Sequence, residues 1–161
     1  MHGAQPDKPV VPRRRSLIRA ALALAVIVAG LSLRGYGFPL GLPAFVVKYG
    51  GSLLWATMVF LLVGALAPRL SRTQIAAIAA AIAIVVEFSR LVHTPWLDAF
   101  RPTTAGALLM GRIFSLWNLV AYLIGIVAGV WLDSRVARLA QDRILPRRSK
   151  LNSQQAGSTR E

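Results

Sequence analysis

The feature that most constrains this chain is a series of four long apolar runs separated by short polar segments. The runs cover residues 17–33, 43–67, 74–92 and 114–132. A helix needs about 20 mostly apolar residues to cross the roughly 30 Å hydrocarbon core of a bilayer, and each run is close to that length. A soluble domain has no place for four such segments, because its surface must stay wet. The pattern therefore predicts an all-α integral membrane protein with four transmembrane helices in a small bundle.

The charged residues support this interpretation, because they are largely segregated from the apolar runs. The chain has 19 Lys and Arg against 6 Asp and Glu, although 55% of its residues are hydrophobic. Many of the basic residues lie in two tails, residues 1–16 and 134–161. We expect the first tail to be disordered and the second to be helical to about Ile144 and disordered beyond it. Basic residues that flank apolar runs are typical of anchoring beside anionic lipid, so we expect no nucleic-acid partner.

The distribution of Lys and Arg also predicts the orientation of the chain. With four spans, both tails and the segment between the second and third runs lie on one side. This side has 14 of the 19 basic residues when Arg19 is counted with the first tail. The other five are Arg34, Lys48, Arg90, Arg101 and Arg112. Because basic residues are enriched on the cytoplasmic side, we expect a multi-pass protein of the bacterial inner membrane with both termini inside.

The start of the chain allows a second interpretation, an export signal. Arg14 and Arg15 before an apolar run resemble a twin-arginine signal. No small-x-small cleavage site follows before Arg34, and three more apolar runs come later. We therefore expect an uncleaved first helix, whose Arg19 reaches back to the lipid headgroups.

Small residues mark surfaces at which helices can approach closely. Ala121, Gly125 and Gly129 recur every four residues along one face of the fourth run, and Ala79 and Ala83 do so on the third. This spacing predicts that the third and fourth helices pack together. A composition that is simply rich in Ala and Gly would produce the same pattern.

Polar side chains near the ends of the runs are the strongest candidates for a functional site. A charge near the hydrocarbon core is costly, so it is expected there only where it is paired, hydrated or needed for function. Under the predicted orientation the candidates share one outer end of the bundle: Lys48, Glu87, Arg90, His93, Asp98, Arg101 and Asn118. Their mixed charge suits a zwitterionic or anionic ligand such as a lipid headgroup. A structural salt-bridge network that holds the outer segment on the helices explains the same residues equally well.

Catalytic and metal chemistry have little support in the sequence. The chain has no cysteine, which excludes thiolate chemistry, and it has no phosphate-loop, nucleophile-elbow or zinc-protease motif. No second His or Cys lies at metal-ligand spacing near His93, so we expect neither a metal nor another cofactor. A lone histidine at an interface is more often an amphipathic residue than an acid–base catalyst.

Four segments resemble a small bacterial membrane family catalogued as domain of unknown function 2809. They are residues 48–55, 87–91, 93–101 and 118–125, within a resemblance over about residues 20–132. A weaker similarity links the order of polar residues to VanZ-type envelope proteins. The resemblance implies a four-helix membrane protein with a shared outer site and no assigned activity. The chain departs from the family pattern at Ser52 and Asn118, where Asp is common, and at Arg90, where Gln is common.

These observations together favour an accessory protein of the bacterial cell envelope that binds a lipid or lipid-linked headgroup at its outer polar cluster. Membrane lipid is the expected partner, and the sequence does not decide between a monomer and a homo-oligomer. One alternative is a structural or assembly protein that binds other helices through its Gly and Ala faces. The other is a small envelope enzyme or carrier.

Overall fold

The computed structural model describes residues 11–103, 106 and 115–142 of the chain, and all regular secondary structure in these ranges is α-helical. The long helices are α1 (Val11–Tyr36), α2 (Ala44–Leu66), α3 (Arg72–Ser89) and α6 (Leu116–Asp142), and α4 (Pro95–Phe100) is short. In this described part, four helices are long and apolar enough to cross a membrane. The predicted all-α membrane fold is confirmed.

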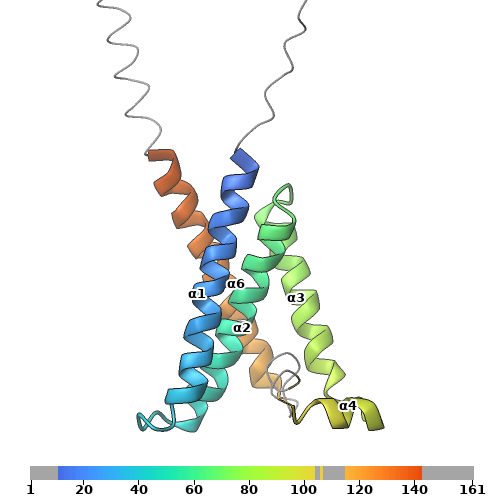
Figure 1. The fold of residues 1–161 in the computed structure, drawn as a ribbon. Helices are drawn as coiled ribbons and strands as arrows, with labels where there is room; N and C mark the ends of the chain where they lie inside the picture. Colours follow the sequence, from blue (N-terminus) through green and yellow to red (C-terminus); the bar gives the residue numbers. More distant parts are fainter. Residues whose placement is uncertain (1–10, 104–105, 107–114, 143–161) are drawn as a thin grey trace, which may run out of the picture.

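The four long helices run alternately up and down, so that α1 begins where α6 ends (Figure 1). We call this end, which also carries the turn between α2 and α3, the basic end. The opposite end carries the turn between α1 and α2 together with α4, and we call it the α4 end. An even number of crossings explains why the start of α1 and the end of α6 share a side. Which side faces the cytoplasm stays a prediction.

The helix boundaries follow from local signals, and the first helix is longer than predicted. α1 begins at Val11, within the predicted N-terminal tail, because arginine is a good helix former and Pro12 is tolerated in a first turn. α2 ends at Leu66, shortly before Pro68. α3 starts at a capping box, in which Ser71 and Gln74 exchange backbone and side-chain hydrogen bonds. The rest of the predicted tails, residues 1–10 and 143–161, lies outside the described residues.

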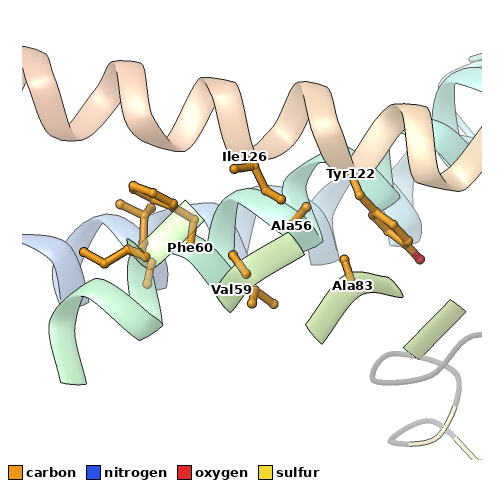
Figure 2. Packing of buried hydrophobic residues seen from close by; sticks show 10 residues of the cluster. Ala56, Val59, Phe60, Ala83, Tyr122 and Ile126 are labelled. Atoms are coloured by element: carbon orange, nitrogen blue, oxygen red, sulfur yellow. The ribbon is translucent and has the colours of Figure 1, made fainter. Parts of the chain in front are cut away.

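The apolar core lies around α2, which contacts α1, α3 and α6. Small and aromatic side chains interlock there, with Ala56 and Phe60 of α2 close to Ile126 of α6 (Figure 2). Ala83 of α3 and Tyr122 of α6 complete the cluster toward the α4 end. The many exposed leucine, isoleucine and valine side chains on the outside of the bundle suit contact with lipid tails.

The predicted contact between the third and fourth spans is present between α3 and α6, but the small-residue face of α6 lies against α2. A Cβ atom on Gly125 would collide with the carbonyl oxygen of Leu53, and one on Gly129 would lie 2.7 Å from Cδ1 of Phe60. Thr57 donates a 2.8 Å hydrogen bond to the carbonyl oxygen of Gly125 across this contact. Ala121 is buried on α6 as well. α3 also contacts α6, but Gly125 and Gly129 face α2 and allow this helix to approach closely.

Candidate functional site

A fully buried carboxylate marks the α4 end of α3. Glu87, in the last turn of this helix, has 0% exposed surface. Nη1 of Arg90 lies 2.6 Å from its Oε2 atom, and the Arg90 side chain is itself only 8% exposed. The i, i+3 spacing on one helix brings the two groups together. Removal of two charges from water is expensive, so this ion pair requires further hydrogen bonds.

Helix α6 supplies those hydrogen bonds from its first turns. The Tyr122 hydroxyl donates to Oε2 of Glu87 at 3.0 Å, and Nδ2 of Asn118 donates to Oε1 at 3.1 Å. The backbone N–H of Ser115 donates to Oε1 at 2.7 Å. Arg90 also donates to the Tyr122 hydroxyl at 2.9 Å. The carboxylate therefore accepts hydrogen bonds from two helices, which satisfies the buried charge.

Helix α2 joins the same group through Ser52, whose hydroxyl lies 3.2 Å from Oδ1 of Asn118. We call Ser52, Glu87, Arg90, Asn118 and Tyr122 the Glu87 network. Sequence reasoning did not select Tyr122 as a site residue. Its spacing of four residues from Asn118, on one helix face, was the available signal. The network ties α2, α3 and α6 together at one level of the bundle.

A second polar group holds α4 onto the end of α3. Arg101 is buried; its Nη1 donates to Oδ1 of Asp98 at 2.9 Å, and its Nη2 donates to the carbonyl oxygens of Ser89 and Val92. A cation near the final carbonyl groups of a helix is favourable, because these carbonyls lack helical partners and carry the negative end of the helix dipole. Nδ1 of His93 lies 3.3 Å from the same oxygen of Asp98. We call His93, Asp98 and Arg101 the Asp98 group.

Lys48 stands apart from both groups. It is exposed, and its Nζ atom lies 5.1 Å from the centre of the Tyr49 ring. It precedes Ser52 by four residues, and Ser52 donates a hydrogen bond to its carbonyl oxygen, so the two residues share a face of α2. Within the ranges that the structure covers, Lys48 has no ion pair with an acidic side chain. All seven predicted site residues thus lie toward the α4 end, distributed between two bonded groups and one exposed lysine.

The opposite end of the bundle holds a polar cluster that sequence reasoning missed. The Asp133 carboxylate of α6 receives Nε and Nη2 of Arg19 from α1 at 2.7 and 3.0 Å. Nε of Arg72, the first residue of α3, reaches the same carboxylate at 2.7 Å. Arg19 also donates to the carbonyl oxygen of Gly64 in α2 at 2.7 Å. This Asp133 cluster joins all four long helices.

The chemistry open to the α4 end differs between its buried and exposed groups. The Glu87 carboxylate is enclosed and hydrogen-bonded, so its lone pairs are occupied. His93 and Asp98 have side chains that are 73% and 44% exposed, and Lys48 is exposed at the same end of the bundle. Among the described residues, no three His, Cys, Asp or Glu side chains gather to hold a metal ion. The arrangement suits binding of a charged group at the surface rather than chemistry in the interior.

Four apolar helices with polar networks at both ends define a small multi-pass α-helical membrane protein. Residues 41–126 match the family described as Protein of unknown function (DUF2809), and the chain belongs to this family. No solved structure matches the chain. The matched range contains the whole Glu87 network and α4, whereas Arg19 and Asp133 lie outside it.

The three positions at which the sequence departs from the family pattern are neighbours in space. Ser52 contacts Asn118, Asn118 contacts Glu87, and Arg90 pairs with Glu87. In this chain, Arg90 therefore provides the cation that balances Glu87.

Proposed function

We propose that this protein has an accessory role in the bacterial cell envelope and binds a lipid or lipid-linked headgroup at its α4 end. In this proposal the protein is in the inner membrane with both termini cytoplasmic, and the α4 end faces outward. The observation that supports the proposal is the exposure of Lys48, His93 and Asp98 at the end of the bundle where the buried Glu87 network lies.

The buried and exposed residues have different tasks in this proposal. The Glu87–Arg90 pair has no net charge, and its hydrogen bonds to neighbouring side chains satisfy its polar atoms. Together with these neighbours it holds α2, α3 and α6 in place. Arg101 holds α4 in the same way. Lys48 then offers a cation to a phosphate, and Asp98 offers a carboxylate to an amine. Exposed groups of opposite charge at one end of the bundle suit the two charges of a zwitterionic headgroup.

The test compares lipid retained by Lys48→Gln and Asp98→Asn with that retained by Arg34→Gln. Arg34 is exposed in the last turn of α1, at the same end of the bundle, so it is a matched control for general surface charge. Native mass spectrometry of protein extracted from membranes of phosphatidylethanolamine and phosphatidylglycerol reports the bound lipid. We expect a roughly fivefold loss of retained lipid for each site variant, since one charged contact contributes about 1 kcal/mol. Equal retention in all three variants would overturn the proposal.

An assembly role is the second candidate, and the exposure of α1 favours it. Along the described part of α1, Arg19 and Ala23 are buried, whereas Leu17, Leu24 and Val28 are at least half exposed. Lipid tails or a second transmembrane helix, including a second copy of this chain, can cover that face. Cross-linking of Leu24→Cys in native membranes tests it, because a defined adduct supports a packed helix and random adducts indicate lipid.

A further inference from the structure

The Asp133 cluster has an unbalanced charge. Two arginines, Arg19 and Arg72, share one carboxylate, so the cluster has a net charge of +1. Arg19 is buried, and each of its nitrogens has an acceptor in Asp133 or in the carbonyl group of Gly64. Arg72 uses only Nε, and its side chain is 44% exposed. Its two terminal amino groups have no hydrogen-bond acceptor among the described residues, so they can receive an external anion.

Two other exposed arginines lie at the same end of the bundle as Arg72. Arg69 is exposed in the turn just before α3. Arg15 is exposed one turn before Arg19 on α1, on the same helix face. Asp133 fixes the position of Arg72, because the carboxylate is only 10% exposed and is held by Arg19 as well. A guanidinium group held in one place loses less conformational entropy on binding a ligand than a free surface arginine does.

The position of the cluster along α6 suits the edge of the hydrocarbon core, next to the lipid headgroups. Seventeen residues separate Leu116, at the start of α6, from Asp133, which corresponds to about 26 Å along the helix axis. That length is close to the hydrocarbon thickness of about 30 Å, so the cluster lies near one membrane surface when the α4 end lies near the other. The neighbouring Trp131 is 54% exposed, and the guanidinium carbon of Arg135 lies 4.9 Å from the centre of its ring. Tryptophan at this position is typical of the interface.

We infer that the basic end has a phosphate-binding site for an anionic phospholipid, formed by the terminal amino groups of Arg72 together with Arg69. Asp133 and Arg19 are the positioning residues. An arginine fork binds phosphate oxygens in a bidentate manner, and the helix positions bring it to the height of the headgroup. This site lies at the opposite end of the bundle from the headgroup site proposed above, and it takes a different ligand, a phosphodiester with a net negative charge.

The experiment measures retention of phosphatidylglycerol by the full chain in nanodiscs that contain phosphatidylcholine and phosphatidylglycerol. Arg72→Gln and Arg69→Gln are compared with Arg138→Gln, a matched control because Arg138 is exposed at the same end on α6. We expect a loss of at least about fivefold for Arg72→Gln and Arg69→Gln and less than about twofold for the control. If Arg72→Gln does not fold, Arg69→Gln decides, because Arg69 is an exposed residue of the turn between helices.

Two further comparisons determine whether lipid is the ligand. Arg72→Lys keeps the charge but loses the fork, so we expect it to retain less phosphatidylglycerol than the unchanged protein. Added inorganic phosphate should leave retention unchanged if the site needs a lipid. Equal losses in Arg72→Gln and Arg138→Gln would overturn the site, since they would reflect surface charge alone. Full displacement by inorganic phosphate would overturn its assignment to lipid.

Discussion

Each buried charge of this protein is held by several groups, and Glu87 is the clearest case. Its carboxylate contacts Arg90, Asn118 and Tyr122, and it has no exposed surface. Removing one partner of a buried ion pair costs more than replacing both partners with apolar residues, because the remaining charge is left unpaired. The residue therefore serves the fold first, and its effect on ligand binding is indirect.

We expect Glu87→Gln to lower the free energy of unfolding by about 3 kcal/mol, because it leaves the buried Arg90 guanidinium without its counterion. Denaturation in mixed micelles, followed by tryptophan fluorescence, measures the change. The double variant Glu87→Gln/Arg90→Gln should lose less than the sum of the single variants, since the two residues are coupled. Lys48→Gln is the control, because Lys48 is exposed and its removal leaves no buried charge without a partner among the described residues. A loss in Glu87→Gln no larger than in this control would contradict the interpretation.

At the residue scale, the sequence predicted local pairs better than distant ones. The Glu87–Arg90 pair follows from its spacing of three residues on one helix. The pair of Arg19 and Asp133 has a separation of 114 residues and depends on where α1 and α6 meet. In the sequence each of these two residues lies at the end of an apolar run, where an unpaired charge is also tolerated. Only the packing of the helices distinguishes a buried cluster from two separate interfacial charges.

At the scale of the helices, α2 and α6 approach most closely at Gly125. A Cβ atom there would meet the backbone of Leu53, which cannot move without shifting α2. At Gly129 the obstacle is the fully buried side chain of Phe60, whose Cδ1 atom would lie 2.7 Å from the added Cβ. Gly51 of α2 has open space around its added Cβ. The three glycines thus form a graded series for one type of substitution.

We expect Gly125→Ala to destabilise the protein by about 1–3 kcal/mol, the usual cost of overpacking. Gly129→Ala should cost less, because the added Cβ meets a side chain at a longer distance than the backbone contact at Gly125. Gly51→Ala should be neutral or stabilising by about 0.5 kcal/mol, since alanine favours a helix more than glycine does. The same unfolding assay in mixed micelles ranks the three variants. Equal effects of Gly125→Ala and Gly51→Ala would show that the α2–α6 contact is looser than described.

The start of α3 depends on its capping box. The Ser71 hydroxyl accepts from the backbone N–H of Gln74, and the Gln74 side chain accepts from the backbone N–H of Ser71. We expect Ser71→Ala to cost about 1 kcal/mol, because a backbone donor at the helix start loses its partner. Hydrogen exchange should then become faster at the first turn of α3, whereas exchange in α2 stays unchanged. Unaltered exchange at that turn would mean that water replaces the cap at no cost.

The helices themselves were predictable from hydropathy, and their boundaries and neighbours were less so. Four apolar runs gave four spans, because no other structure satisfies the backbone in lipid. The start of α1 at Val11 was missed, since a basic segment looks polar although arginine favours helices. The partner of the glycine face was also missed. Small residues indicate that some helix approaches closely, but several helices compete for that position.

At the scale of the whole molecule, two polar networks hold the ends of one apolar bundle. The Glu87 network joins α2, α3 and α6 near one end, and the Asp133 cluster joins all four long helices near the other. Between them the contacts are mostly apolar, with small residues and one hydrogen bond from Thr57 to the carbonyl oxygen of Gly125 (Figure 2). This division suits a bilayer, because charges are cheapest at its two surfaces. Both binding proposals therefore depend on which end of the bundle faces the cytoplasm.

Orientation is tested by labelling single cysteines, since the chain has none of its own. Leu40, which is 76% exposed in the turn between α1 and α2, reports on the α4 end. Arg69, exposed in the turn between α2 and α3, reports on the basic end. With intact cells and a membrane-impermeant maleimide, we expect Leu40→Cys to react and Arg69→Cys to react only after lysis, because the basic residues are concentrated at the latter end.

The unchanged cysteine-free chain provides the background, and labelling after lysis shows that both positions can react. The reverse pattern would contradict the charge rule for this protein and place Lys48, His93 and Asp98 at the cytoplasmic surface. A headgroup reached from that side would belong to the inner leaflet, and an envelope role would lose its support. The Arg72 site would then face the outer leaflet. Since anionic lipids contribute to the negative potential of the cytoplasmic leaflet, the expected pattern is the one in which Arg72 meets the lipid it fits.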